Sequence, residues 1–255
     1  VHIGVDAQRE SYCPPCLDAT NVYYIECASE MGNWDLSKDI ICENRRTYTY
    51  LDENAFNFSR VGRMSGKFSL ENNGLECILN RTFAYLDIGG QLNLRSNKII
   101  RIDPGAFFRA RIVNLRLGFN CMSALAANVW TDSFFSESLV EVELDRNFFA
   151  TIPDCVSNLT KLDRVNLSQN YLTAVPANAL ANVPSLQNLQ MSFMNSLEEF
   201  SLQFLTNHPR IRKLDIGCTS IRNRTLVDGM MAFLLNSTVA SPDLCGFSAP
   251  PVNCT

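Results

Sequence analysis

The fold is decided by the stretch Val165-Asn166-Leu167-Ser168-Gln169-Asn170-Tyr171-Leu172, because its pattern returns along the chain. A second copy reads Leu92-Asn93-Leu94-Arg95-Ser96-Asn97-Lys98-Ile99. In both, two apolar residues alternate with polar ones, and an asparagine stands three positions after the second apolar residue. Five copies place this asparagine at intervals of 23 to 27 residues, at Asn73, Asn97, Asn120, Asn147 and Asn170. Two weaker copies follow, Leu186/Leu189/Met191 and Ile211/Leu214/Ile216.

This spacing has a physical explanation. Alternating apolar residues point to one side of a short strand, while the residues between them face solvent. A unit of this length is too small to bury its own apolar side, so successive units stack and share one core. The asparagine stands where the chain leaves the strand, and its amide can bond the backbone of the turn. The pattern predicts an α/β leucine-rich repeat solenoid, a horseshoe with a parallel concave sheet.

The 255 residues divide into three predicted parts. Residues 1–45 are interpreted as a cysteine-rich N-terminal cap, residues 46–222 as about seven repeats, and residues 223–255 as a C-terminal cap. The apolar run at residues 230–235 predicts a cap helix and is too short to cross a bilayer, so no direct membrane insertion is expected within this chain. An anchor beyond Thr255 stays open. The longer interval between Asn120 and Asn147 predicts an inserted loop.

Cysteines and glycosylation sequons together indicate an extracellular protein. Ten cysteines are an even number, and six lie near the two ends, at Cys13, Cys16, Cys27, Cys42, Cys245 and Cys254. Asn-x-Ser/Thr sequons stand at Asn57, Asn80, Asn158, Asn166, Asn223 and Asn236, with a seventh at Asn253. The combination predicts a secreted or cell-surface glycoprotein with disulfide bonds.

The predicted disulfides lie within the caps. The four N-terminal cysteines are expected to bond among themselves, and Cys245 is expected to bond Cys254 or Cys218. The same four cysteines would also suit a zinc ion, but outside the cell the disulfide interpretation is favoured, so no metal is expected. The interior residues Cys77, Cys121 and Cys155 fall at different phases of the repeat. They are therefore not expected to bond one another, and two of them are interpreted as buried thiols.

Composition and motifs exclude several classes of function. Charged residues make up 19% of the chain, the net charge is −4, and no basic stripe is present, so nucleic acid is not an expected partner. Two histidines are present, without nucleophile, phosphate-binding or zinc-protease motifs. Cys13-Pro14-Pro15-Cys16 has thioredoxin-like spacing but lacks the strand and helix which that motif requires. We expect a protein that is not an enzyme and binds no cofactor.

The outward strand positions predict the ligand surface. The candidate ligand residues there are charged, and they are Arg95, Arg116, Glu141, Glu143, Asp145 and Arg164. Two interpretations stay open: an acidic centre for a basic partner, or lateral ion pairs that keep the sheet soluble, the second being favoured. Trp130 and Phe134 in the insertion are candidate anchors, with core packing as the alternative. Asn166 also faces outward, so a glycan there would direct a ligand to repeats two to four.

These motifs resemble those of extracellular leucine-rich repeat proteins, the class of Toll-type receptors, plant receptor-like proteins and adhesion ectodomains. Leu244-Cys245-Gly246, followed by Cys254, is similar to the cap of plant receptor-like proteins. The resemblance implies a receptor, co-receptor or adhesion ectodomain that binds a protein or peptide ligand, in immunity or cell-surface signalling. A secreted enzyme inhibitor and a structural matrix or surface-coat glycoprotein stay open as alternatives. A homo- or heterodimer also stays open.

Overall fold

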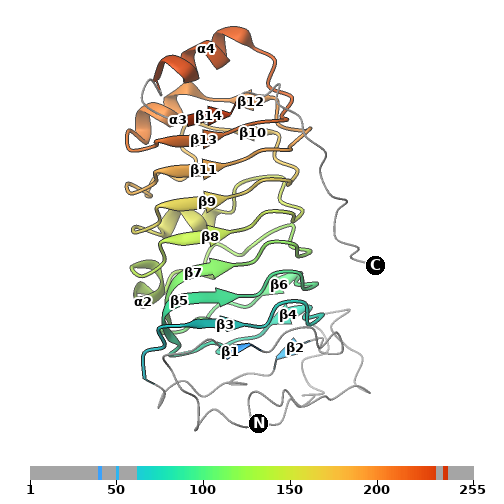
Figure 1. Ribbon diagram of the computed structural model, residues 1–255, viewed down its shortest axis with the longest axis vertical. Helices are drawn as coiled ribbons and strands as arrows, with labels where there is room; N and C mark the ends of the chain where they lie inside the picture. Colours follow the sequence, from blue (N-terminus) through green and yellow to red (C-terminus); the bar gives the residue numbers. More distant parts are fainter. Residues whose placement is uncertain (1–39, 42–49, 52–61, 234–237, 241–255) are drawn as a thin grey trace.

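The computed structural model describes residues 40–41, 50–51, 62–233 and 238–240, and it is a solenoid built on one long parallel sheet (Figure 1). The nine strands of this long sheet are β1 (Ile40–Ile41), β3 (Lys67–Ser69), β5 (Asp87–Asn93), β7 (Arg111–Arg116), β8 (Glu141–Glu143), β9 (Arg164–Asn166), β11 (Asn188–Gln190), β13 (Lys213–Asp215) and β14 (Thr238–Ala240). They neighbour one another in that order, and each pairing is parallel. The predicted parallel sheet is confirmed.

The other side of the solenoid carries short elements. One small parallel sheet there consists of β2 (Tyr50–Leu51), β4 (Cys77–Ile78) and β6 (Arg101–Ile102). A second consists of β10 (Ala174–Val175) and β12 (Glu199–Phe200). The helical segments are α2 (Ser133–Ser136), the 3-10 helix η4 (Asp154–Asn158), α3 (Leu202–Asn207) and α4 (Arg224–Phe233). Each helical segment precedes a strand of the long sheet. They therefore lie where the chain returns to that sheet. Figure 1 shows α2 and α3 at the left edge of the sheet and α4 across its upper end.

Burial follows the alternation in the sequence. Leu92 and Leu94 are fully buried, and Val165 and Leu167 are at most 1% exposed. The equivalent strand residue is buried in each of the seven repeats, at Phe68, Leu92, Leu115, Val142, Val165, Leu189 and Leu214. These side chains belong to one continuous core cluster. A solenoid core of this kind grows by addition of repeats, so its size is not limited by the surface-to-volume ratio of a globule.

The asparagines form a hydrogen-bonded ladder beside the long sheet. Asn97 Oδ1 accepts from the backbone N–H groups of Asn73 and Leu75, at 2.9 and 3.1 Å. Its Nδ2 donates to the carbonyl oxygens of Leu70 and Leu94, both at 3.0 Å. Equivalent bonds to the same and the preceding repeat are made by Asn120, Asn147 and Asn170. The predicted role of these residues is confirmed.

The turn persists where the asparagine is missing. Repeats 6 and 7 have Met194 and Thr219 at the ladder position. The residue before it nevertheless has a positive φ, 58° at Phe193 and 57° at Cys218. The same left-handed conformation occurs in the other five repeats, at Asn72, Ser96, Phe119, Arg146 and Gln169. Neighbouring repeats thus hold the turn in a conformation that is uncommon for residues other than glycine.

The insertion between repeats 3 and 4 completes an aromatic core. Trp130 is fully buried, and its ring stacks on Phe135 with centroids 5.9 Å apart. Phe135 stacks on Phe107 at 5.0 Å, and Phe107 on Phe83 at 5.7 Å. The hypothesis that Trp130 anchors a ligand is therefore wrong. The longer repeat turns the indole inward, where its large apolar area is removed from water.

The long sheet extends beyond the predicted repeat region on both sides. β1 lies within residues 1–45, and β14 lies within residues 223–255, and both pair in parallel with the neighbouring repeat. The predicted cap helix is confirmed as far as the end of α4 at Phe233. The division at residues 45 and 222 stays a prediction, because caps and repeats share one sheet here.

The interior cysteines differ from expectation. Cys155 and Cys218 are buried thiols, so the proposed bond between Cys245 and Cys218 is wrong. Cys77 and Cys121 are both disulfide-bonded. They stand at different positions of the repeat and two repeats apart, which the ~4.8 Å strand spacing makes too far for a bond between them. Comparing interior cysteines only with one another therefore missed these disulfides. The six end cysteines lie outside the described residues.

Candidate binding surface on the long sheet

The solvent-facing residues of the long sheet form three columns that differ in exposure. The first column stands at the start of the strands, where Arg164 and Lys213 are exposed and the members in the other five repeats are half-buried. The third column lies beside the asparagine ladder, where Asp145 and Ser168 are only 7% and 8% exposed. The second column, which includes Arg116, is half-buried in repeats 3 to 7. A partner lying on this face therefore meets the first two columns.

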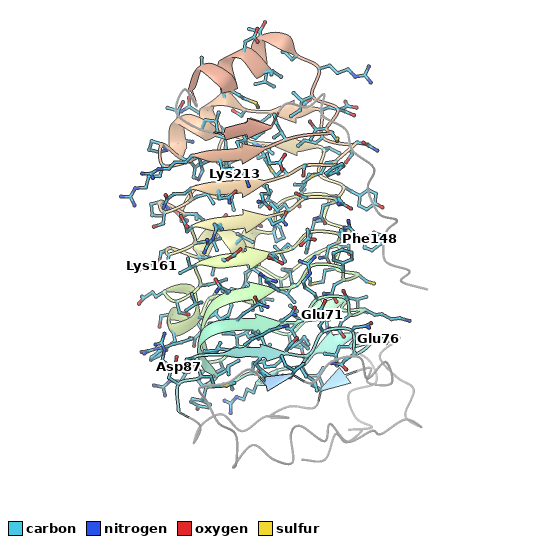
Figure 2. All side chains as sticks on the ribbon, viewed as in Figure 1. Glu71, Glu76, Asp87, Phe148, Lys161 and Lys213 are labelled. Atoms are coloured by element: carbon cyan, nitrogen blue, oxygen red, sulfur yellow. The ribbon has the colours of Figure 1, made fainter. Side chains whose placement is uncertain are left out.

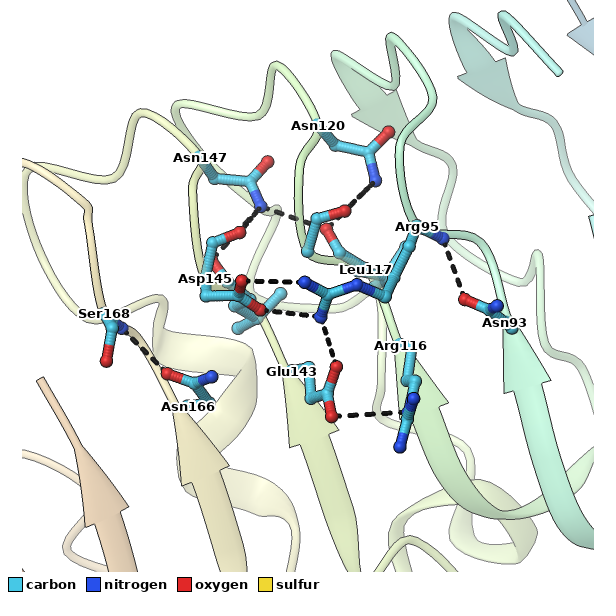
Figure 3. A network of polar contacts seen from close by, with 12 residues as sticks. Asn93, Arg95, Arg116, Leu117, Asn120, Glu143, Asp145, Asn147, Asn166 and Ser168 are labelled. Carbon is cyan, nitrogen blue, oxygen red and sulfur yellow. Dashed lines mark hydrogen bonds and ion pairs between the residues drawn. The ribbon is translucent and has the colours of Figure 1, made fainter. Parts of the chain in front are cut away.

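Arg95 connects repeat 2 with repeat 4 (Figure 3). Its Nη1 and Nη2 donate to the two carboxylate oxygens of Asp145, each at 3.0 Å, and Nη1 also donates to Glu143 Oε2. The side chains of Arg95 and Asp145 are 19% and 10% exposed. Burial lowers the pKa of Arg95, but the carboxylates of Asp145 and Glu143 together outweigh it, so this pKa lies above its usual value.

Gly118 makes this connection possible. It occupies the third column of repeat 3, directly between the partners. A Cβ at this position would lie 2.3 Å from Asp145 Oδ1 and 2.7 Å from Arg95 Nη1. The guanidinium therefore passes over repeat 3 through a gap that any larger residue would fill.

The same guanidinium also packs on an aromatic ring. Arg95 Cζ lies 4.8 Å from the centroid of Phe119, and Arg146 Cζ lies 4.1 Å from it. Both distances are within the range of a cation–π contact. Phe119 thus fixes the orientation of Arg95 from a second direction.

Two further ion pairs neutralise the acidic repeat. Arg116 Nε lies 3.3 Å from Glu143 Oε1, and Arg164 Nη2 lies 3.3 Å from Glu141 Oε2. Every carboxylate of the predicted acidic centre therefore has an arginine partner, as the favoured interpretation of lateral ion pairs requires. Arg116 and Arg164 remain 39% and 46% exposed, whereas Arg95, Glu143 and Asp145 are mostly covered by one another.

Asn166 lines a shallow hollow on this face. The hollow has a volume of about 40 Å³ and is lined by Glu141, Val142, Glu143, Arg164, Val165, Asn166, Asn188 and Gln190. Asn166 Oδ1 accepts from the N–H of Ser168 at 3.0 Å. This bond uses the amide oxygen and leaves the nitrogen, to which a glycan would attach. Asn166 therefore supports its turn, a role that the sequence did not predict.

The other sequons lie away from this face or outside the described residues. Asn158 and Asn223 are exposed, and Asn80 is half-buried. Asn223 Oδ1 also accepts from the N–H of Leu226 at 3.1 Å, at the start of α4. Asn57 and Asn236 lie outside the described residues. Glycosylation stays a prediction at all of these positions.

Phe134 belongs to the edge of the sheet. It is half-buried in α2, and Arg109 and Arg111 each place Cζ 5.1 Å from its ring centroid. Because α2 precedes β8 and Arg111 begins β7, this contact lies where the strands begin. Phe134 therefore lies at the edge of the sheet and not beside the polar centre formed by Arg95 and Asp145.

Two features of the described residues concern metal binding and the buried histidine. Among them, no group of three His, Cys, Asp or Glu side chains is placed to hold a metal ion. His208 is 3% exposed, and its two ring nitrogens lie 2.8 and 2.9 Å from the carbonyl oxygens of Phe204 and Leu180.

In the described part of the chain, every helix falls short of the length and apolarity that a membrane span needs.

Comparison with known proteins agrees with the repeat architecture. Residues 137–197 match the model of the leucine-rich repeat family. Residues 137–197 therefore carry the leucine-rich repeat sequence pattern, and the seven recurring turns and the long parallel sheet extend the α/β leucine-rich repeat solenoid fold over the described residues. Among curated protein sequences, none matches the chain.

Several solved structures share the fold. The Toll chain of the Drosophila Toll–Spatzle complex is similar with a TM-score of 0.65 and 21% identity, over 80% of this chain and 28% of that one. Human 5T4, a trophoblast glycoprotein, has a TM-score of 0.56 and 20% identity, over 79% and 75%. TLR13 in complex with ssRNA13 has a TM-score of 0.59 and 19% identity, over 75% and 27%. The chain thus spans about a quarter of the length of the two Toll-type proteins.

Proposed function

We propose that this chain is an extracellular recognition module that binds a protein or peptide ligand on the first two columns of the long sheet, in repeats 2 to 4. The observation that carries the proposal is a fixed polar surface. Arg95, Glu143 and Asp145 hold one another in place, and Arg116 extends from the same network toward solvent. Binding to side chains that are already ordered costs less conformational entropy than binding to free ones.

Sequons, cysteines and similar structures support this function. Six well-formed sequons and the disulfides at Cys77 and Cys121 fit an oxidising, extracellular environment. Toll was solved with Spatzle, a protein, and TLR13 with single-stranded RNA. On this chain the accessible side chains Arg116, Glu141 and Arg164 have mixed charges, which favours a protein over a phosphate backbone.

Glycans placed by mutation test the location of the ligand. Arg116→Thr creates the sequon Asn114-Leu115-Thr in repeat 3, and Gln190→Thr creates Asn188-Leu189-Thr in repeat 6. The glycosylated protein first captures its partner from native extracts. We expect the glycan at Asn114 to abolish binding of that partner and the glycan at Asn188 to leave it intact. Arg116→Ala and Gln190→Ala are the controls, because they remove the same side chains without adding sugar.

The result also separates the remaining alternatives. Equal binding by both glycosylated variants, or loss only with the glycan at Asn188, would place the ligand elsewhere and contradict the proposal. A captured enzyme that loses activity on binding would define a secreted inhibitor. Capture of matrix components without saturable affinity would indicate a structural glycoprotein. Selective capture of single-stranded RNA would reject a protein ligand.

A further inference from the structure

A second surface lies at the edge where the chain enters the long sheet, and it is made of alternating arginine and aromatic side chains. Its members, called the arginine–aromatic edge below, are Arg81, Tyr85, Phe108, Arg109, Arg111 and Phe134. Figure 2 labels Asp87 at this edge of the sheet and Phe148 at the opposite one. Nothing in the proposed function uses this edge.

The six side chains form one connected stack. Arg81 lies over the ring of Phe108 at 5.1 Å, and Phe108 meets Tyr85 edge-on with centroids 5.7 Å apart. Arg109 lies 5.9 Å from the Tyr85 centroid and 5.1 Å from that of Phe134, which Arg111 also approaches at 5.1 Å. Rings and guanidinium groups therefore support one another across repeats 1 to 4.

The charges of this stack are available to a partner. All three arginines are exposed, and in the part of the chain that the structure describes none of them forms an ion pair with a carboxylate. A guanidinium that stacks through its face keeps the N–H groups along its rim for hydrogen bonds. Tyr85 is 40% exposed, so an apolar surface lies between the charges.

A hollow adjoins the stack beside Phe134 and Arg111. It has a volume of about 330 Å³ and is lined by Arg111, Ser133, Phe134, Glu137 and Ser138. Asp87 is the register partner of Arg111 in the sheet, and its Oδ1 lies 3.6 Å from Nη1 of Arg63. Glu137 and Asp87 would repel a uniformly anionic polymer such as a sulfated glycan. A protein segment can instead place its carboxylates on the arginines and apolar side chains on Tyr85 and in the hollow.

We infer that the arginine–aromatic edge is a second interaction surface, which binds an acidic and partly apolar segment of a protein partner. It is separate from the surface on the sheet face, and it uses the two residue types, arginine and aromatic, that dominate the energetic centres of protein interfaces. Three of its residues, Arg81, Tyr85 and Arg109, have positive φ values of 59°, 63° and 53°. Gly105 takes the place of Arg81 in the next repeat, with φ 81°.

The test uses a short fluorescein-labelled peptide of alternating Glu and Leu, with binding followed by anisotropy near physiological salt. We expect Arg109→Gln with Arg111→Gln to weaken binding by roughly tenfold or more. Phe134→Ser is expected to weaken it by roughly fivefold. The matched control, Arg210→Gln with Arg212→Gln, removes two exposed arginines at the same spacing just before β13, away from the stack, and should change the affinity by less than about twofold. Unchanged thermal unfolding of each variant shows that the fold is kept.

Four results would overturn this inference. The first is failure of the peptide to bind the unmodified protein. The second is an equal loss of peptide affinity in the edge and control variants, and the third is unaltered peptide binding by Arg111→Lys, which keeps the charge but not the planar group. The fourth is that heparin binds, the peptide does not, and the edge variant loses heparin binding, which would assign the edge to a sulfated glycan. None of these variants adds a glycan to the sheet face, so the two proposals fail independently.

Discussion

Substitution of Gly118 by alanine tests whether the bridge from Arg95 to Asp145 stabilises the solenoid. The added Cβ would lie 2.3 Å from Asp145 Oδ1 and 2.7 Å from Arg95 Nη1, so the ion pair must open. An exposed pair contributes at most about 1 kcal/mol, whereas breaking a buried pair costs about 3–5 kcal/mol. Arg95 and Asp145 are 19% and 10% exposed, close to the buried case, but both regain some water on opening. We expect Gly118→Ala to lower the free energy of unfolding by about 2 kcal/mol.

Urea unfolding followed by circular dichroism measures this change, with two controls. Gly89→Ala adds a methyl group to the same sheet, but its Cβ meets only the exposed side chain of Arg63, at 3.1 Å, which can move away. It should cost less than about 0.5 kcal/mol. In a background of Arg95→Ala with Asp145→Ala, the cost of Gly118→Ala should also fall below about 0.5 kcal/mol. An equal cost in both backgrounds would show that the methyl group acts on something other than the ion pair.

Three further predictions concern single residues. Asn97→Leu removes the ladder bonds and leaves buried backbone groups without partners, so we expect a loss of about 3 kcal/mol or more in the same urea assay; a change below about 1 kcal/mol would contradict the ladder as a source of stability. Burial raises the pKa of Glu76, and Lys98 opposes part of this shift. The folded state therefore binds the proton more tightly than the unfolded state, so the free energy of unfolding falls as the pH rises above 4.5, the pKa of this group in the unfolded chain. Glu76→Gln should therefore raise the unfolding midpoint near pH 7 and change it little near pH 4, and a larger gain at the lower pH would reverse the sign of this argument. Burial raises the pKa of the Cys155 thiol to about 12, so iodoacetamide should label Cys155 only after unfolding, as read by mass spectrometry.

The repeat architecture was predictable because its determinants are local and repeated. Leu92 and Leu94 alternate within one strand, and Asn97 stands at a fixed distance from them, so three positions define the strand, the core side and the turn. Each neighbouring repeat imposes the same geometry again. This redundancy explains why repeats 6 and 7 keep the turn although Met194 and Thr219 replace the asparagine.

The candidate site was predictable only in part, because its contacts depend on residues far apart in the sequence. The pairing of Arg95 with Asp145 needs the absence of a side chain at Gly118, and no local pattern reveals that. Trp130 was ambiguous because a large aromatic residue is equally suited to an interface and to a core. The arginine–aromatic edge was missed because four of its six members, Arg81, Tyr85, Phe108 and Arg109, occupy turns before the strands, where neither strand alternation nor the asparagine spacing assigns a direction to a side chain.

The reach of Arg95 also affects how this molecule unfolds. In a solenoid each repeat contacts only its neighbours, so unfolding can begin at an end and proceed one repeat at a time. Arg95 is bonded to Asp145, 50 residues away and two repeats further along. Repeats 2 to 4 therefore share a contact that is lost as a whole when any one of them opens. Native-state hydrogen exchange should detect these three repeats as a single cooperative unit, with the later repeats opening separately.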